Sequence, residues 1–180
     1  MLFRSVTEDK VLQTGVAKIL EAIYEADFRD CSFGYRPHIS PKDAVKGLCK
    51  SLQYGKFNHI VEADIRSFFD SIDHDILLEM LKKRIDDRKI LNLIRKWLKA
   101  GILETDGRIT DPVTGTPQGG IVSPILANIY LHYVLDEWFE DVAKPHFPGQ
   151  VKLVRFADDF VCAFQYPDDE IGRASCRERV

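Results

Sequence analysis

The stretch VRFADDFVCAF, residues Val154 to Phe164, places two adjacent aspartates between two apolar runs. Both runs are typical of buried strands, so the stretch predicts a β-hairpin with Asp158 and Asp159 at its turn. Aspartate is common in turns because it hydrogen-bonds to its own backbone, and the pair can be a solvated turn without a task. The alternative is a pair of metal ligands, because carboxylates this close raise each other's pKa unless a cation compensates them. That interpretation needs a third carboxylate on another strand.

The segment VEADIRSFFDSIDHD, Val61 to Asp75, supplies the third carboxylate. Residues His59–Ile65 roughly alternate between apolar and polar, which predicts a strand with Asp64 at its end. If this strand lies beside the hairpin, Asp64 falls near the aspartate pair. Three carboxylates at strand ends can hold two divalent cations, which stabilise the attacking and leaving oxygens of a phosphoryl transfer. Hard oxygen ligands favour Mg²⁺ over softer metals.

The remaining acidic residues of this segment have a simpler interpretation. Asp70, Asp73 and Asp75 are expected to serve only as turn and cap residues. A metal site through His74 is not favoured, because Asp75 is expected to cap the helix that follows.

Patterns of periodicity, caps and breakers predict the order of the elements along the chain. The predicted helices span Thr7–Phe28, Ser40 to about Leu52, Asp75–Arg84, Asp87–Ala100 and Ser123 to about Val142. The first carries its apolar stripe on Leu12, Val16, Ile19, Leu20 and Ile23. Strands are predicted at His59–Ile65 and in two hairpins, Ile102–Asp111 with Asp106-Gly107 at the turn and Val151–Phe164. This order predicts an α+β fold in which an antiparallel sheet carries helices on one face.

Composition sets broad limits on function. The chain has 180 residues, of which 45% are hydrophobic, and this suits one domain with a real core, either alone or with a small satellite. Its net charge of −3 argues mildly against nucleic-acid binding on composition alone. No apolar run approaches the roughly 20 residues of a membrane span, and no signal peptide opens the chain. The four cysteines lack metal-ligand spacing and are typical of reduced thiols in a cytosolic protein.

Both ends of the chain look foreign to the fold. Residues 1–5 and the tail IGRASCRERV, residues 171–180, resemble translated sequencing-adapter DNA. We therefore exclude them from fold reasoning and expect the natural segment to span about Val6–Glu170.

The loop TPQGGIVSP, Thr116 to Pro124, precedes a predicted helix. Its glycine pair lets the backbone approach a ligand closely, and the positive helix N-terminus suits phosphate or a stacked base. By itself, such a pattern is most often only a turn.

Together, DIRSFFD, TPQGGIVSPILANIYL and RFADDF resemble the three core palm motifs of reverse transcriptases, in the same order. The similarity is closest to the group II intron-encoded reverse transcriptase/maturase family. TEDKVLQ, FGYRP, RKWLKAG and DEWFE resemble the same family, so the likeness covers nearly all of Val6–Tyr166. Phe156 stands where that family usually has tyrosine in its third motif. The resemblance implies a right-hand polymerase fold, with an antiparallel palm sheet backed by helices.

The resemblance also implies roles for individual residues. Asp64 and Asp158 would bridge two Mg²⁺ ions, Asp159 would complete the carboxylate set, and Ile65 would lend a backbone carbonyl. Phe69 stands at the family's steric gate against a 2′-hydroxyl. Three further residues match positions that contact substrate: Gln118 and Gly119 at the incoming nucleotide and template base, and Arg36 at the triphosphate or template. Arg36 can also be read as a surface loop arginine.

The implied partners are an intron RNA template, a DNA primer and dNTPs, with no membrane, and the oligomeric state is left open. The implied location is the cytoplasm, with association to the nucleoid during retrotransposition. Residues 6–56 are expected to form part of the fingers and residues 57–170 an incomplete palm without thumb or maturase domain. The fragment is therefore expected to be inactive by itself.

Three other functions share parts of this pattern. A reverse transcriptase tied to a CRISPR or phage-defence system would carry the same motifs. A non-catalytic RNA-binding maturase relic would have no physical reason to keep the costly acidic cluster. A Mg²⁺ nuclease or nucleotidyl cyclase shares a palm-like sheet, but it would need neither the TPQGG loop nor Phe69.

Overall fold

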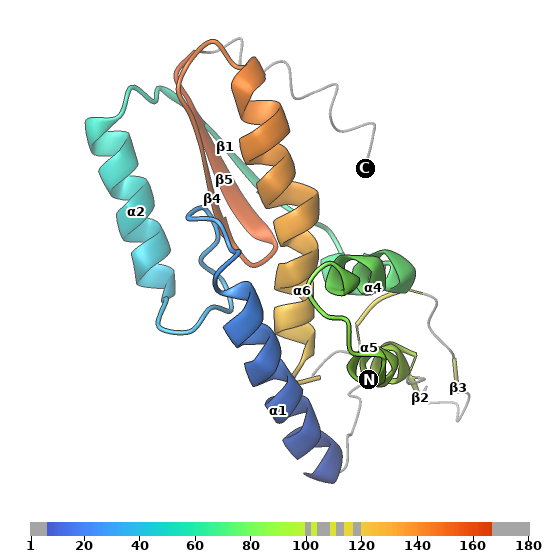
Figure 1. Cartoon of the computed structure of the whole chain (residues 1–180). Coiled ribbons are helices and arrows are strands. Elements are labelled where there is room, and N and C mark those ends of the chain that lie inside the picture. The colour runs from blue at the N-terminus through green and yellow to red at the C-terminus, as the bar shows by residue number, and fades with distance from the viewer. Residues whose placement is uncertain (1–6, 100–101, 104–108, 111–113, 117–119, 167–180) are drawn as a thin grey trace. The chain divides into compact units, whose positions relative to one another are not determined.

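The computed structural model describes residues 7–99, 102–103, 109–110, 114–116 and 120–166. In chain order these residues form α1 (Thr7–Tyr24), α2 (Pro41–Tyr54), β1 (His59–Asp64), α3 (Phe68–Ser71), α4 (His74–Lys82), α5 (Arg88–Leu98), β2 (Ile102–Leu103), β3 (Ile109–Thr110), α6 (Ser123–Leu131), the π-helix η1 (His132–Ala143), the 3₁₀ turn η2 (Lys144–His146), β4 (Val151–Phe156) and β5 (Asp159–Phe164) (Figure 1). The segments expected to be adapter-derived lie outside the described residues.

The chain divides into two compact units that interleave along the sequence. The helical unit combines the residues up to Phe28 with Arg66–Tyr133, and the sheet unit combines Arg29–Ile65 with the chain from Val134 onward. The expected division at about residue 56 into fingers and palm stays a prediction.

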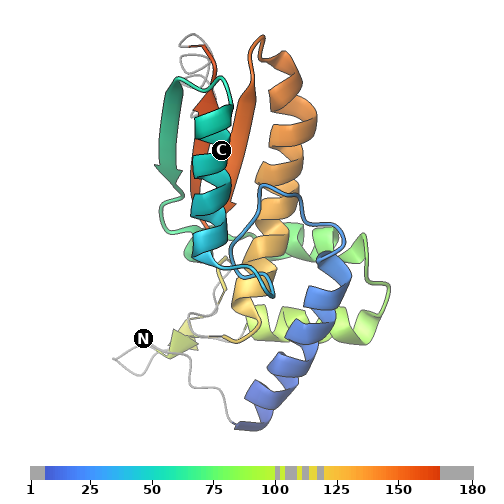
Figure 2. The same cartoon turned by 90° about the vertical axis from the view of Figure 1, so that its left-hand side faces the viewer.

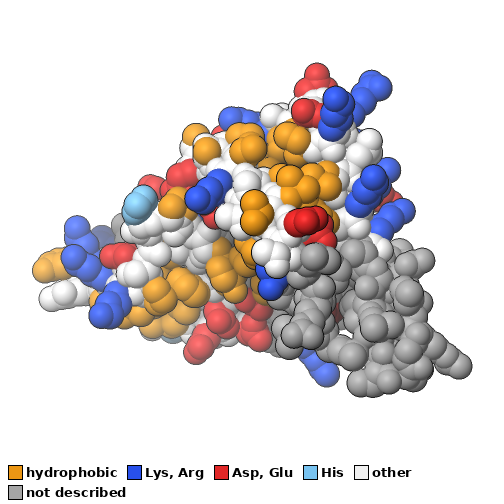
Figure 3. All heavy atoms as spheres, turned by 90° about the horizontal axis from the view of Figure 1, so that it is seen from below, with side chains coloured by type: hydrophobic (Ala, Val, Ile, Leu, Met, Phe, Trp, Pro, Cys, Tyr) orange, Lys and Arg blue, Asp and Glu red, His pale blue; other side chains and the backbone are white. Residues whose placement is uncertain are grey.

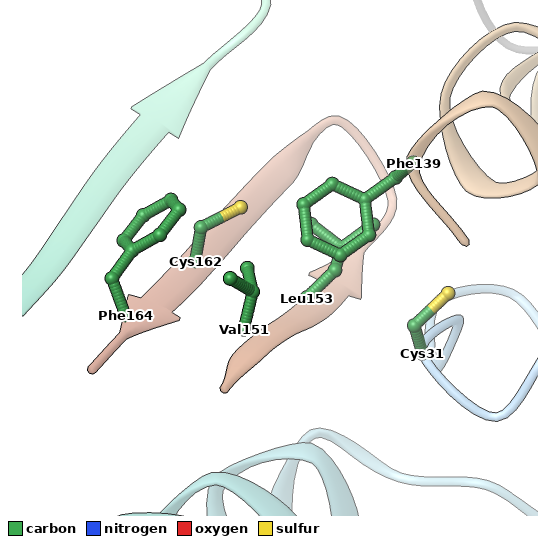
Figure 4. Close-up of a cluster of buried hydrophobic side chains, with 6 residues drawn as sticks. All are labelled: Cys31, Phe139, Val151, Leu153, Cys162 and Phe164. Carbon is green, nitrogen blue, oxygen red and sulfur yellow. The ribbon is translucent and has the colours of Figure 1, made fainter. Parts of the chain in front are cut away.

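The sheet unit is built on a three-stranded antiparallel sheet in the order β1-β5-β4. One face of this sheet carries alternate apolar residues of β4 and β5, and Phe139 of η1 packs against them (Figure 4). This core cluster consists of Cys31, Phe139, Val151, Leu153, Cys162 and Phe164. Burial raises the pKa of Cys31 to about 12, so this thiol packs as a neutral apolar group.

The opposite face of the sheet is also covered. Val154 and Ala163 alternate with the core cluster along β4 and β5, yet both are buried. Helix α2 lies on this side, across the sheet from η1 (Figures 1 and 2). The sequence predicted helices on one face; the structure adds a helix on the other face, because β4 and β5 carry buried apolar residues on both faces.

Cap residues define where the helices begin. Asp73 accepts hydrogen bonds from the backbone N–H groups of Asp75 and Ile76, both at 2.9 Å, and so caps α4. The prediction that Asp75 is the cap was wrong, because Asp75 already lies in the first helical turn. Asp87 caps α5 as predicted, and its Oδ1 accepts a hydrogen bond from the backbone N–H of Lys89 at 2.7 Å.

The buried face of α1 differs from the predicted one. The helix buries Gln13, Val16, Ala17, Leu20 and Tyr24, whereas Leu12 and Ile19 are 47% and 48% exposed. Val11, also on α1, is 70% exposed. Figure 3 shows hydrophobic side chains at the surface among charged ones on the face seen from below.

The other predicted elements are present with shifted ends. Strands β2 and β3 pair antiparallel as predicted, but the turn residues Asp106 and Gly107 lie outside the described residues. The predicted long helix begins at Ser123 as α6 and continues as η1. No helix in the described ranges is long and apolar enough to cross a membrane.

Candidate active site

The two acidic segments singled out in the sequence meet in the sheet unit. Strand β1 pairs antiparallel with β5, and Asp64, the last residue of β1, is the direct partner of Asp159, the first residue of β5. Directly opposed residues of an antiparallel pair present their side chains to the same face of the sheet. The predicted proximity of Asp64 to the aspartate pair is thus found in the register itself.

The third strand extends this row. Phe156 ends β4 and is the partner of Asp159 on its other side, so Phe156, Asp159 and Asp64 form one row across the sheet. Asp64 and Asp159 are exposed, and Asp158 is half-buried in the two-residue turn between β4 and β5. The row thus presents two carboxylates and an aromatic ring at one end of the sheet, with a third carboxylate at the adjoining turn.

The charges in this row act on one another. Partial desolvation raises the pKa of Asp159, and the negative charges of Asp64, Asp158 and Glu62 raise it further. Glu62 contributes because it stands two residues before Asp64 on the same face of β1. These neighbouring negative charges disfavour the ionised form of Asp159, and a bound cation would relieve the repulsion.

The side chains are not gathered into a complete ligand set. Within the residues that the structure describes, no three His, Cys, Asp or Glu side chains form a group able to hold a metal ion. That Asp64, Asp158 and Asp159 share a metal stays a prediction. Asp158 belongs to the turn rather than to the paired row, and three like charges repel one another. The donors themselves, hard carboxylate oxygens, fit Mg²⁺.

A buried ion pair lies directly behind the turn. The side chains of Arg155 on β4 and Asp136 on η1 are both completely buried. Nε of Arg155 donates to Oδ1 of Asp136 at 2.7 Å, and Nη2 donates to Oδ2 at 2.6 Å. Sequence reasoning missed both residues. The available signal was an arginine between Val154 and Phe156, in the apolar run that precedes the aspartate pair.

The turn residue Ala157 has an unusual conformation. Its φ is +57°, in the left-handed region that non-glycine residues rarely adopt. Gly34 of the FGYRP segment packs against it so closely that an added Cβ would lie 2.2 Å from the Ala157 nitrogen. From the sequence, Gly34 has no predicted role beyond its place in FGYRP, whereas the structure gives it a contact at the aspartate turn.

Arg36 also has a structural task in the sheet unit. Its Nη1 donates to the carbonyls of Ser32 at 2.7 Å and Arg29 at 3.2 Å. These bonds fix the loop that leads to Gly34. A contact of Arg36 with triphosphate or template stays a prediction.

Phe69 lies in the helical unit and is half-buried. Its carbonyl accepts a hydrogen bond from the N–H of Thr116 at 2.8 Å, so the DIRSFFD segment is tied to the start of the TPQGG loop. Gln118 and Gly119, in that loop, lie outside the described residues. Ile65 directly follows β1, and its role as a carbonyl ligand is also untested.

The reverse transcriptase (RNA-dependent DNA polymerase) family profile matches residues 2–177, a range that includes most of both end segments. The chain belongs to the reverse transcriptase family. It is 47% identical over 124 residues to the group II intron-encoded protein LtrA of Lactococcus lactis subsp. cremoris, a match that covers 69% of this chain and 20% of that relative. It is 45% identical over 134 residues to an uncharacterized 91 kDa protein in a cob intron of Schizosaccharomyces pombe, covering 74% of this chain and 16% of that relative.

These relatives confirm the resemblance to group II intron reverse transcriptases and maturases. The chain spans about a fifth or less of the length of these two relatives. Among solved structures, an apo telomerase from Candida Tropicalis truncated from its C-terminal domain matches 93% of this chain and 36% of its own, with a TM-score of 0.61 and 12% identity. That likeness concerns the fold alone and confirms an α+β polymerase fold for this reverse transcriptase segment.

Proposed function

We propose that this chain is the catalytic core of an RNA-directed DNA polymerase of a group II intron-type retroelement. It would add dNTPs to a DNA primer on an RNA template, and its action in the cytoplasm at nucleoid DNA is part of the proposal. The observation that carries the proposal is the direct pairing of Asp64 with Asp159 beside Asp158. Family membership supplies the reaction type, and the acidic row supplies a location for it.

The proposed chemistry depends on the carboxylates of the row and of the adjoining turn. Asp64, Asp158 and Asp159 would hold two Mg²⁺ ions, which would neutralise charge that develops on the attacking and leaving oxygens. The negative potential of the row, expressed in the raised pKa of Asp159, supports this assignment. Ile65, which follows Asp64 directly, would add its carbonyl oxygen to the set.

The remaining residues would position the substrates. Phe69 would stand against the 2′-position of the incoming nucleotide and favour dNTPs over NTPs. Its hydrogen bond to Thr116 links it to the loop that would place Gln118 and Gly119 at the nucleotide and template base. Arg36 would reach the triphosphate or template in addition to its bonds within its own loop.

Affinity for RNA would come largely from other parts of the full-length protein. The chain carries 25 basic and 28 acidic residues, too few positive charges to dominate phosphate binding. The isolated 180-residue chain is therefore expected to extend no primer. The motifs do not separate an intron host from a CRISPR or defence system, and no structural observation favours the latter.

The test is primer extension on an RNA template by the full-length protein that contains this segment. Asp64→Asn removes one charge from the paired row and should abolish dNTP incorporation at any Mg²⁺ concentration tested. Glu62→Gln is the matched control, because Glu62 is exposed on the same face of β1, two residues from Asp64, and has no proposed ligand role. Glu62→Gln should keep extension near the wild-type rate. Wild-type extension by Asp64→Asn would contradict the proposal.

A further inference from the structure

We infer that Arg155, held by Asp136 and Ser32, is a positioning residue that sets the geometry of the aspartate turn. This inference rests on the proposed function, because the turn matters for catalysis only if its aspartates hold metal. The inference assigns a role to Arg155, Asp136 and Ser32, which have no proposed contact with substrate or metal and lie on segments far apart in the sequence.

The guanidinium of Arg155 connects three segments of the sheet unit. Two of its nitrogens bind both carboxylate oxygens of Asp136, as described above. Nη2 also donates to Oγ of Ser32 at 2.7 Å, and Nη1 donates to the carbonyl oxygen of Ala157 at 2.9 Å. The planar, rigid fork of arginine therefore relates η1 and the Ser32 loop directly to the turn.

The bond to Ala157 bears on the orientation of a single peptide group. The carbonyl of Ala157 belongs to the peptide that links it to Asp158, so fixing this oxygen fixes the plane from which Asp158 departs. Ala157 has the left-handed φ described above, and such a conformation persists only where the surroundings determine it. Arg155 supplies one such determinant from inside the sheet unit.

A second, independent contact acts on the same residue. The segment Cys31–Phe33 pairs with β4 as a short parallel bridge. The backbone N–H of Arg155 donates to the Cys31 carbonyl at 2.7 Å, and the N–H of Phe33 donates to the Arg155 carbonyl at 2.9 Å. This bridge delivers Gly34 against the nitrogen and Cα of Ala157, with no room for a side chain. The turn is thus held through its carbonyl by Arg155 and through its nitrogen side by Gly34.

A buried ion pair contributes little net stability to a protein core. Removing two charges from water is costly, and apolar residues of similar size often serve stability equally well. What the pair supplies is directional geometry: a bidentate link with one remaining nitrogen aimed at the Ala157 carbonyl. This favours a positioning role over a purely stabilising one.

The test separates positioning from stability with Mn²⁺ as the probe. Mn²⁺ affinity of the 180-residue chain is measured by electron paramagnetic resonance, and folding is monitored by circular dichroism. Arg155→Lys keeps the charge but loses the fork, and Ser32→Ala removes one acceptor while leaving the ion pair intact. The matched control is Arg29→Lys, because Arg29 pairs with Asp141 on the same helix η1 at 2.8 Å, both side chains are exposed, and neither touches the turn.

We expect Arg155→Lys to bind Mn²⁺ about 10–100-fold more weakly than wild type, as is usual for groups that orient metal ligands. Ser32→Ala should change affinity in the same direction by a smaller factor, and Arg29→Lys should bind like wild type. In the full-length protein, Arg155→Lys should need correspondingly more Mg²⁺ for half-maximal primer extension, and excess Mg²⁺ should restore much of its rate. A loss of stability alone would not shift the metal dependence in this way.

Asp158→Asn, measured alongside, separates the two levels of the proposal. If Asp158→Asn weakens Mn²⁺ binding while folded Arg155→Lys binds like wild type, the positioning role is overturned and the proposed function stands. If Arg155→Lys does not fold, Ser32→Ala decides, and wild-type affinity in that variant overturns the inference. If Asp158→Asn itself binds Mn²⁺ like wild type, the proposed function fails and the inference fails with it.

Discussion

Asp64 and Asp159 are direct cross-strand partners, one at the end of β1 and the other at the start of β5. Like charges placed opposite each other on a sheet are destabilising. A fold that needed only stability would gain from replacing either residue. Under the proposed function, this pairing is a local cost to stability that serves cation binding.

The first prediction concerns the stability of this pair. Asp159→Asn should raise the free energy of unfolding of the chain at neutral pH, because it removes a charge from the repulsive row. The gain should be roughly 0.2–1 kcal/mol, the size found for exposed charge pairs. Since the pKa of Asp159 is raised in the folded state, the wild-type penalty is present above that pKa. It should fade as the pH falls toward the ordinary aspartate value of about 3.9, as urea unfolding at a series of pH values would show.

Asp43→Asn is the control of opposite sign. The side-chain hydroxyl and then the backbone N–H of Ser40 lower the pKa of Asp43 through hydrogen bonds at the start of α2. Its charge therefore stabilises the fold above the ordinary pKa, and this contribution is lost as the pH falls through the lowered value. Asp43→Asn should destabilise at neutral pH. Destabilisation by Asp159→Asn as well would contradict the electrostatic description of the row.

Much of this site was predictable because it rests on local patterns. Alternation identified the strand at His59–Ile65, and two apolar runs identified the hairpin at Val151–Phe164; both are found with nearly the same ends. The order of motifs then indicated the polymerase fold. Cap positions were less predictable, because Asp73 and Asp75 both lie shortly before the apolar run that begins at Ile76, and only the backbone conformation separates them.

The supporting structure behind the turn could not be predicted in the same way. The hydrogen bonds from Arg155 to Asp136 and Ser32 join residues that are 19 and 123 positions apart in the sequence. Periodicity reports only on neighbours within one helix or strand, so it cannot predict contacts at such separations. The face of α1 was misjudged because its apolar residues extend around more than one side of the helix. Gln13 is buried there, and its side-chain oxygen accepts a bond from the N–H of Ile121 at 3.0 Å.

The second prediction compares two glycines. Gly34→Ala should destabilise the chain, because its Cβ would collide with backbone atoms of Ala157 that cannot move easily. Gly15→Ala, within α1, has nothing within 4 Å of the added Cβ and should stabilise by about 0.5–1 kcal/mol, as helix propensity predicts. Thermal unfolding followed by circular dichroism would check both. A neutral Gly34→Ala would show that the close packing at the turn is not required.

The third prediction tests which aspartate caps α4. Asp73→Ala should lower the free energy of unfolding by about 0.5–2 kcal/mol, because it removes the acceptor for two helix N–H groups. Asp75→Ala removes only an exposed side chain with a distant Arg95 partner at 3.8 Å, and it should change stability by less than about 0.5 kcal/mol. Equal losses in urea unfolding would argue against the assignment of Asp73 as the cap.

The fourth prediction concerns the choice of sugar. In the full-length protein, Phe69→Ala should increase NTP incorporation relative to dNTP incorporation, because the proposed contact against the 2′-hydroxyl is removed. Phe68→Leu is the comparison, because Phe68 is buried and has no proposed substrate contact. The centroids of the Phe68 and Phe69 rings lie 5.6 Å apart. The ratio of kcat/KM for the two nucleotides is the measurement. An unchanged ratio in Phe69→Ala would remove Phe69 from the proposed site.

The most direct test of the metal-site assignment is Asp158→Asn in the full-length protein, assayed for dNTP incorporation on an RNA template and for intron RNA binding at one fixed salt concentration. The substitution keeps the size of the side chain but removes one negative charge from the site. Catalysis depends on cations that stabilise developing charge, whereas RNA affinity is spread over many phosphate contacts. We predict that primer extension is abolished while RNA binding survives. Wild-type extension, or lost RNA binding in a folded variant, would contradict the assignment.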